Sequence, residues 1–477
     1  MYDAPSQNRS RMAIIESNAP ASRASKQNTR GRVLFASLIG TTIEFYDFYA
    51  YATASVLVFP TLFFPKASEI HAILSAFAIF GVAFVARPLG SVLFGHQGDR
   101  LGRKGTLVLS LLVMGIATFL IGFLPAAAGS FVVIAPLLLV LLRFAQGLAL
   151  GGEWSGAALL ATENAPANKR AIYGTFPQLG APIGFILANT VFVALQKFLT
   201  QAQFMDWGWR VPFFLSALLV PVGLWVRLNL VESATFQKVV EQSKVVRSPF
   251  AATIKHHWRG VVAGTFIMFA TYVIFYLMTS FTLTYGTAPA TVQQAAAAAA
   301  SKGKSFDPAG FVPGLGIARP EFLTMLILGV VFFGVFTVIS GPLAERFGRR
   351  KFLIAVSIAI LLFGLSWTLF FGPGKSAAMI GLILGFTLTG LTFGPMAAIL
   401  PELFPSNVRY TGSAVAYNLS SVIGAAPASF VAIALWQAGR GTTMWVGVYL
   451  ALSAALSLIA LFISAETRDT DYENNLG

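Results

Sequence analysis

Two acidic side chains and one arginine stand within apolar segments, where a charged group is costly and defaults to a functional role. Glu44 and Asp47 are three residues apart and Tyr51 follows four residues later, so a helix would place all three on one face. Arg143 and Gln146 have a similar spacing in a later apolar segment. At about 1.5 Å per helical residue, these groups lie near the middle of a membrane. We therefore expect Asp47 and Arg143 to pair inside a helical bundle.

Such a pair has the chemistry to couple a proton to an anion. A carboxylate in a low-dielectric interior favours its protonated form, whereas a carboxylate beside an arginine favours its ionised form. Protonation of Asp47 would free Arg143 to bind an anion, or an anion at Arg143 would drive proton uptake. Glu44 is the alternative proton carrier. The competing interpretation is a static salt bridge that only holds two helices together.

The composition shows that lipid is the solvent for most of this chain. Charged residues make up 11% of the 477 residues and hydrophobic residues 56%, against about 25% charged in soluble domains. The absence of cysteine excludes disulfides and thiolate metal sites. The four histidines have no metal-ligand spacing, so we expect no metal and no cofactor besides a coupling proton.

Apolar runs long enough to cross a bilayer recur along the chain. They predict an all-α membrane protein with twelve transmembrane helices in two pseudo-symmetric six-helix bundles, because the alternation of barrel strands is missing. The predicted helices are 33–60, 70–94, 106–125, 131–160, 172–196, 211–230, 259–286, 320–342, 352–371, 377–400, 412–436 and 443–464. The predicted regions are a tail at 1–32, a bundle at 33–230, a linker at 231–258, a bundle at 259–465 and a tail at 466–477.

The placement of basic residues orients these helices. With both termini inside, the inner segments hold 23 of the 33 Lys and Arg residues and the outer loops hold 8. This asymmetry predicts cytoplasmic termini. It also explains the net charge of +14 through anionic lipid headgroups, so we expect no nucleic-acid partner.

Two motifs occur once in each half. The predicted loop GHQGDRLGRK begins at Gly95, and its counterpart GPLAERFGRRK begins at Gly341, 246 residues later. The pattern E-x-x-P-x-x-x-R begins at Glu163 and again at Glu402, 239 residues later. Two motifs at nearly one offset indicate duplicated bundles, with a substrate site between the halves near the midplane.

The motifs, the linker and the six-plus-six plan resemble the major facilitator superfamily. GTTIEFYDFYAYA, ARPLGSVLFGHQGDRLGRK, RFAQGLALGGEWSGA and LPELFPSNVRYTG are similar to the metabolite:proton symporter family, and shikimate-like members look closest. The resemblance runs from about Val33 to Arg468 and implies a multi-pass protein of the bacterial inner membrane, functional as a monomer. It also implies that Asp47 and Arg143 stand where sugar-porter relatives have a first-helix Asp and a fourth-helix Arg. Glu345 departs from the usual Asp, and the 287–319 outer loop looks long.

The resemblance further implies a cytoplasmic gate at the inner helix ends, closed by ion pairs and helix-end contacts. The alternative is that these basic residues serve only topology. Arg87 and Glu153 lie near the inner face and are expected to belong to gate or packing networks. The predicted gate residues are Asp99, Arg100, Arg103, Lys104, Glu153, Glu163, Arg170, Glu345, Arg346, Arg349, Arg350, Glu402 and Arg409.

The second half has almost no charge at membrane depth, so its candidates are neutral. The expected substrate-binding residues are Arg143, Gln146, Tyr51, Gln178, Tyr272, Tyr276 and Asn418, with Tyr417 beside the last. Packing is the competing role for each tyrosine. Proton chemistry would then belong to the first bundle, and the second would supply shape.

The sequence predicts a secondary transporter and not an enzyme, because no set of nucleophiles or metal ligands shares one depth. The preferred reading is proton-coupled symport of a small organic acid by alternating access. Proton symport of a zwitterionic osmolyte such as proline or betaine stays open, as does an uncoupled facilitator.

Overall fold

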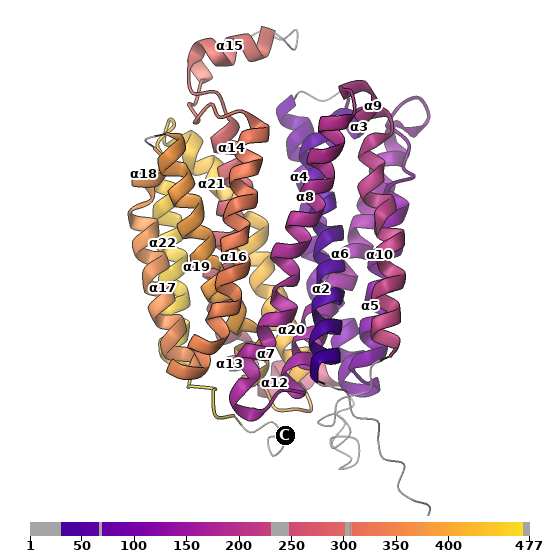
Figure 1. Ribbon diagram of the computed structural model, residues 1–477, viewed down its shortest axis with the longest axis vertical. Coiled ribbons are helices and arrows are strands. Elements are labelled where there is room, and N and C mark those ends of the chain that lie inside the picture. The colour runs from indigo at the N-terminus through magenta and orange to yellow at the C-terminus, as the bar shows by residue number, and fades with distance from the viewer. Residues whose placement is uncertain are drawn as a thin grey trace, which may run out of the picture.

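The computed structural model describes residues 30–65, 69–229, 248–300, 306, 308–372 and 374–470, and in these ranges it contains twelve membrane-length helical spans in two bundles. Figure 1 shows the bundles side by side, with α2 beginning and the described chain ending at the same end. We call this the terminal end; the charge distribution predicts that it faces the cytoplasm. The twelve predicted spans are thus confirmed as helices, with ends moved by a few residues.

The first bundle is built from six spans, of which the fifth is broken into two helices. They are α2 (Arg30–Leu57), α4 (Glu69–Leu101), α5 (Arg103–Ile121), α6 (Phe131–Glu163), α7 (Arg170–Gln178) with α8 (Gly180–Phe198), and α10 (Val211–Leu228). The short helices α3 (Phe59–Phe63) and α9 (Gln201–Asp206) lie in its outer connections.

The second bundle repeats this plan with three interrupted spans. They are α13 (Trp258–Tyr276) with α14 (Thr282–Thr287), α16 (Arg319–Phe347), α17 (Arg349–Leu365) with α18 (Trp367–Phe370), α19 (Lys375–Glu402), α20 (Arg409–Ser420) with α21 (Ala426–Ala438), and α22 (Met444–Ile463).

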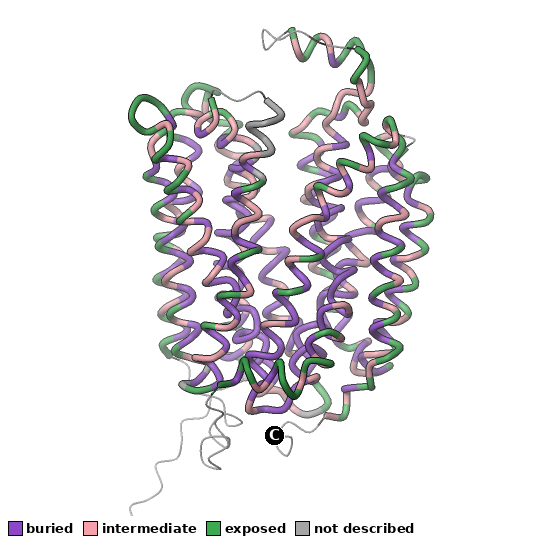
Figure 2. Tube along the Cα trace, turned by 180° about the vertical axis from the view of Figure 1, so that it is seen from behind, coloured by how far each residue is buried: buried purple, intermediate pink, exposed green. Residues whose placement is uncertain are grey.

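Ten of the spans are long and apolar enough to cross a membrane by length and hydropathy. The other two are α2, which carries Glu44 and Asp47, and α17, which has 17 residues. In Figure 2 the buried positions face the inside of the bundles and exposed positions face outward. Many exposed side chains are large and apolar, such as Leu93 and Leu141. This pattern is expected when the outer surface contacts lipid.

The two GxxxDR-type motifs are helix ends and not the open loops expected from the sequence. Helix α4 continues through the motif to Leu101, and α5 begins at Arg103 after Gly102 alone. Likewise Gly348 alone separates α16 from α17. Their φ angles of 107° and 90° explain the glycines, because other residues rarely adopt positive φ. Each motif therefore fixes a tight turn between two long helices.

Three of the four interrupted spans are those that begin with α7, α13 and α20. Pro182 has no N–H to donate to the carbonyl of Gln178, and α7 ends there. Two π-helical turns, Leu277–Phe281 and Ser421–Ala425, interrupt the spans that contain α13 and α20. Such turns occur mostly within functional regions of helices.

The linker and the long outer segment are partly helical. Helix α12 (Pro249–His256) lies within the predicted linker, whereas residues 230–247 and residues 1–29 of the predicted tail at 1–32 lie outside the described residues; α2 begins within that tail, at Arg30. Helix α15 (Val292–Ala300) contains the alanine run and lies beyond the end of the bundle opposite the termini (Figure 1). Trp436 Nε1 donates to the Pro313 carbonyl at 3.2 Å and so fixes the return of this segment.

Candidate functional site

A cavity lies between the two halves, with about 410 Å³ of empty space when the part open to solvent is included. Most of its wall is aromatic, with a few hydroxyl groups, which is typical of a small-molecule site. The lining residues are Phe45, Phe48 and Tyr49 of α2, Arg87 of α4, Ala181 of α8, Met268, Thr271, Tyr272, Phe275 and Tyr276 of α13, Phe333 of α16, Thr389 and Phe393 of α19, and Tyr417 of α20.

Arg87 is the one charged side chain among these lining residues. Its guanidinium lies 4.6 Å from the centroid of the Phe84 ring and 5.1 Å from that of Phe48. Its Nε has no hydrogen-bond partner among the described residues, although the side chain is 4% exposed. The cavity therefore presents a buried cation whose contacts are aromatic faces.

Close packing of α4 on α6 positions Arg87. A Cβ at Gly151 would lie 2.1 Å from the Arg87 carbonyl oxygen, and one at Gly147 would lie 2.4 Å from that of Ala83. These glycines therefore allow the close contact between the two helices. The second half repeats the contact, since a Cβ at Gly390 would lie 2.5 Å from the Phe333 carbonyl oxygen.

The repeat makes Phe333 the counterpart of Arg87. The two residues are 246 positions apart, which is the offset of the two motifs, and both line the cavity. The duplicated site thus has an arginine on one side and a phenylalanine on the other. The first half supplies the charge, and the second half supplies shape.

The predicted binding residues divide between the cavity and its surroundings. Tyr272 and Tyr276 line the cavity, and Tyr272 Oη has no partner among the described residues. Gln178 and Asn418 lie just below it, as described in the contacts that follow. Tyr51, Arg143 and Gln146 are absent from its lining.

Arg143 is fully buried among aromatic rings of α2 and α4. Its Cζ lies 4.0 Å from the centroid of Tyr51 and 4.8 Å from that of Phe80. Its Nη1 donates to Gln146 Oε1 at 3.0 Å, and Gln146 Nε2 donates to Thr118 Oγ1 at 2.7 Å. This arginine is held by rings and one amide inside the first bundle.

Asp47 does not meet Arg143 in this conformation. Its Oδ2 accepts from Ser216 Oγ of α10 at 3.0 Å, and its Oδ1 has no partner among the described residues. The rotation of α2 directs Asp47 toward α10 and α5, while Arg143 lies under Tyr51, four residues further along α2. The expected ion pair is therefore not formed, although both residues lie at similar depth.

A second acidic group lies closer to the terminal end. Three charged side chains act on Glu44 electrostatically, namely Glu153 of α6, Arg227 of α10 and Arg87 of α4. Glu153 forms an ion pair with Arg227 of α10, whose Nη1 also donates to the Leu107 carbonyl. Glu153 thus belongs to the interior of the first bundle and not to a gate between halves.

Tyr417 lines the cavity and Trp154 stacks against it, and we call this pair the cavity floor. Trp154 Nε1 donates to Gln178 Oε1 at 2.8 Å, and Gln178 Nε2 donates to the Phe393 carbonyl at 2.6 Å. The Trp154 ring stacks on Tyr417 across the two halves. Rings and amides therefore separate the cavity from the terminal end.

A second layer of cross-half contacts lies beneath this floor. Asn418 Nδ2 donates to the Gly151 carbonyl at 2.6 Å, and Tyr410 Oη donates to the Gly152 carbonyl at 2.6 Å. Both donors come from α20 and both acceptors from α6. Asn418 is therefore a contact between halves and not a cavity residue in this conformation.

The paired motifs close the terminal end symmetrically. Asp99 accepts from the backbone N–H groups of Tyr410 and Thr411 at 3.2 and 2.9 Å. Glu345, its counterpart, accepts from the N–H of Ala171 at 2.7 Å. Each carboxylate binds the amino end of a helix in the opposite half, where the helix dipole favours a negative charge.

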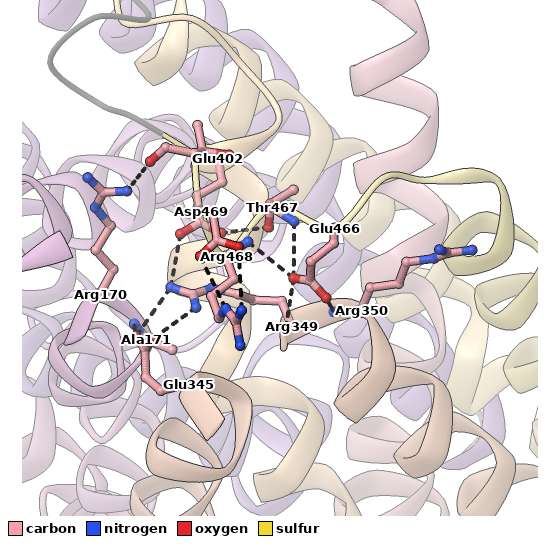
Figure 3. Close-up of polar contacts among 11 residues, drawn as sticks. Arg170, Ala171, Glu345, Arg349, Arg350, Glu402, Glu466, Thr467, Arg468 and Asp469 are labelled. Carbon is pink, nitrogen blue, oxygen red and sulfur yellow. Dashed lines mark hydrogen bonds and ion pairs between the residues drawn. The ribbon is translucent and has the colours of Figure 1, made fainter. Parts of the chain in front are cut away.

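Ion pairs within the second half extend this closure (Figure 3). Arg349 is fully buried and pairs with Glu345 at 2.9 Å and with Glu402 at 3.1 Å. Thr467 Oγ1 donates to Glu402 at 2.6 Å, and Arg170 of the first half donates to the Thr470 carbonyl. Thr467 and Thr470, in the described part of the predicted C-terminal tail, thus belong to the closed end.

The remaining predicted gate residues take different positions. Arg350 donates to the carbonyls of α22, Arg409 donates to the Phe404 carbonyl, and Arg100 and Arg346 are exposed. Lys104 and Glu163 have polar or charged partners of their own. The Arg103 side chain lies outside the described ones.

The comparisons with known proteins agree with this architecture. The family described as sugar (and other) transporter matches residues 33–249 and 308–474. The chain belongs to that family. A solved structure of the major facilitator superfamily proton:xylose symporter XylE aligns with a TM-score of 0.71 at 16% identity, covering 94% of this chain and 98% of that one. The fold is therefore the major facilitator fold.

The sequence relatives are transporters and not enzymes. The chain is 52% identical to the Escherichia coli inner membrane metabolite transport protein YhjE, over 92% of this chain and 95% of that protein. It is 34% identical to the E. coli shikimate transporter, over 92% and 95%. It is 29% identical to a Salmonella typhimurium proline/betaine transporter, over 91% and 83%. This protein is a multi-pass membrane transporter of metabolites.

Arg87 is a cavity residue that was not predicted from the sequence. The depth of a residue along its helix does not fix the rotation of that helix, so depth alone does not show which arginine faces the cavity. The repeat contained a usable signal, because the offset of 246 aligns Arg87 with Phe333. A position that is charged in one half and aromatic at the equivalent position of the other half indicates that the two halves have different functions there.

Proposed function

We propose that this transporter carries a small organic acid, bound as its anion, together with a proton, across the bacterial inner membrane. Both termini face the cytoplasm in this proposal, and one chain is the functional unit. The observation that carries it is the buried Arg87 guanidinium in an aromatic cavity, with its Nε lacking a hydrogen-bond partner among the described residues. A buried cation that has no hydrogen-bonded anion beside it is costly, and a substrate carboxylate would supply that anion.

The rest of the cavity suits a compact, partly apolar acid. Tyr272 and Tyr276 can donate hydroxyl protons, and Phe275 and Phe333 offer ring faces to substrate carbon. A shikimate-like ring acid combines these features. The shikimate transporter among the relatives supports this class, as one of several.

Alternating access follows from the closed terminal end. Binding at Arg87 would draw the halves together above the cavity, while Asp99 and Glu345 would release their helix ends below it. Substrate would then leave toward the cytoplasm. The carboxyl groups near the cavity floor are the candidates for carrying the proton.

A thermal-shift screen of the purified protein tests the proposal. Shikimate, other small carboxylates, proline and glycine betaine are added in excess, at acidic and at neutral pH. A ligand that binds the folded state stabilises it according to its concentration relative to Kd. We expect a carboxylate to raise the melting temperature of the wild type, and more so at acidic pH.

Variants assign the effect to Arg87. Arg87→Gln is expected to abolish the carboxylate shift, and Arg87→Lys to keep part of it, because lysine retains charge without the planar fork. Arg259→Gln is the matched control, since Arg259 lies over Trp258 at the end of α13. A carboxylate shift that survives in Arg87→Gln would contradict the proposal.

One observation favours the alternative function, proton symport of proline or betaine, and it is the aromatic lining of the cavity. The faces of Tyr49, Tyr272 and Phe275 could hold a quaternary ammonium. A shift confined to betaine or proline would favour that reading. Uptake of an acid that ignores the pH gradient would instead favour an uncoupled facilitator.

A further inference from the structure

We propose that Glu44 and Glu153 form a single proton-binding site, with Arg227 as its fixed counter-charge and Arg87 as its link to the substrate. This inference rests on the proposed anion transport and names the place of the coupling proton. Asp47, which the sequence favours as the proton carrier, is then not the site that binds the coupling proton.

The geometry begins with a close approach of α10 to α2. A Cβ at Gly40 would lie 2.3 Å from Arg227 Nη2, so glycine leaves room for the guanidinium one turn before Glu44. Arg227 reaches past Gly40 to pair with Glu153. Glu44, Glu153 and Arg227 are 2%, 0% and 3% exposed.

Glu44 and Glu153 share one arginine, Arg227, which pairs with Glu153 and acts on Glu44. The two carboxyl groups act on each other electrostatically, and Glu44 Oε2 and Glu153 Oε2 have no hydrogen-bond partner among the described residues. Two carboxylates in contact resist simultaneous ionisation. With one shared proton the pair would need only the positive charge of Arg227, whereas the doubly ionised pair needs a second positive charge nearby, and Arg87 supplies it.

The charges around Glu44 come from identified helices. Glu153 of α6, Arg227 of α10 and Arg87 of α4 act on it directly, and it acts on Tyr417 of α20. Asp47, on its own helix, contacts Ser216 instead. The other helices against α2 carry their charged residues at their ends, at Lys104 of α5, Arg170 of α7 and Lys197 of α8.

Charge balance then couples the proton to the anion. With the cavity empty, the two positive charges of Arg87 and Arg227 balance two ionised carboxylates. An anion bound at Arg87 adds one negative charge to the cluster of Arg87, Arg227, Glu44 and Glu153. The cluster with its anion becomes neutral again only when the Glu44–Glu153 pair takes up one proton. A net charge is costly in this buried region. Anion and proton therefore bind together and leave together.

Linkage fixes the sign and size of the effect. If binding of one anion takes up one proton, the anion's Kd rises by up to about tenfold per pH unit where the pair is otherwise ionised. The effect is reciprocal, so the anion also raises the proton affinity of the pair. Glu44→Gln places a neutral amide beside Glu153 and keeps the Glu153–Arg227 ion pair, and so imitates the protonated state.

The first experiment needs no substrate. Infrared difference spectra of the purified protein, recorded as pH is lowered, report the carbonyl band of a newly protonated carboxyl group. We expect one such band to be lost in Glu44→Gln and also in Glu153→Gln, and to persist in Glu321→Gln, whose carboxylate is exposed at the opposite end. A band that survives in both pair variants and disappears in Asp47→Asn would overturn the inference.

The second experiment measures the affinity for shikimate, or for the carboxylate that the thermal-shift screen selects, over a range of pH. We expect the wild-type Kd to rise with pH by up to tenfold per unit and the Glu44→Gln Kd to stay flat. A flat wild-type profile, or a wild-type slope retained in Glu44→Gln, would contradict the coupling. If Glu44→Gln does not fold, the same measurement is made on Glu153→Gln, which removes the other carboxyl group of the pair.

The two experiments separate the two proposals. If no carboxylate binds the wild type, the proposed substrate class fails, while the infrared titration still locates the proton site. If a carboxylate binds through Arg87 but the carboxyl band belongs to Asp47, the substrate class stands and the Glu44–Glu153 site fails.

Discussion

The indole of Trp154 lies flat on the phenol ring of Tyr417, with ring centroids 3.9 Å apart and an angle of 3° between the planes. Trp154 comes from α6 of the first half and Tyr417 from α20 of the second. This stack closes the bottom of the cavity and belongs to no single bundle. It has to break when the terminal end opens, because the two helices belong to opposite halves.

Removal of the indole is expected to favour the open terminal end. An aromatic pair contributes about 0.5–1.5 kcal/mol beyond burial, which corresponds to a shift of about 2- to 12-fold in Trp154→Ala. The natural chain has no cysteine, so a single Ala414→Cys, buried beside Leu159 and Tyr410, reports opening through its labelling rate. Trp225→Ala, on an exposed face, is the control, and an equal labelling rate in both variants would refute the role of the stack.

Asp99 is expected to be a principal lock of the terminal end. Asp99→Asn loses the charge that binds the start of α20, at a cost of about 1–3 kcal/mol. This corresponds to about a 5- to 150-fold increase in the open population. Labelling of Ala414→Cys in the Asp99→Asn background measures the increase. An unchanged rate would mean that the other cross-half contacts suffice for closure.

Arg349 is expected to be the strongest single stabiliser of the second half's terminal end. Its removal leaves Glu345 and Glu402 without their cation, and breaking a buried pair in this way costs about 3–5 kcal/mol. Arg349→Ala should therefore unfold at a clearly lower temperature than wild type in detergent. Arg346→Ala, which changes an exposed arginine three residues earlier, should shift stability by no more than about 0.5 kcal/mol. Similar losses in both variants would argue against a specific network.

Glycine packing is expected to control the position of Arg87. Gly151→Ala forces α4 away from α6 and should cost about 1–3 kcal/mol of stability while weakening carboxylate binding. Gly390→Ala, at the equivalent contact beside Phe333, should cost similar stability and leave more of the binding intact. Gly81→Ala, with nothing within 4 Å of the added Cβ, should affect neither. Binding and melting temperature are measured on the same preparations, and equal binding losses at Gly151 and Gly390 would contradict the positioning role.

The twelve spans and their grouping could be predicted from the sequence, because the cost of placing backbone and charge in lipid imposes long apolar runs. The duplicated motifs likewise predicted two related bundles. The ends of the helices that contain these motifs could not be predicted so well. The sequence suggested loops at Gly95 and Gly341, but the helices continue to Leu101 and Phe347, since a single glycine with positive φ is enough to turn the chain.

The site was predicted less well, for a definite physical reason. Position along a helix gives depth, and on that basis Asp47 and Arg143 were expected to meet. Rotation about the helix axis depends on the packing of neighbouring helices, and it directs Asp47 to Ser216 and places Arg143 beneath Tyr51.

The sequence by itself determined that this chain crosses a membrane twelve times as two related halves, because hydrophobic length and repeated motifs are local properties. Only the tertiary structure decided that Arg87 faces the cavity and that Glu44 meets Glu153. Those contacts join helices far apart in the chain, and the close approaches at Gly151 and Gly40 that create them exist only when the helices are packed.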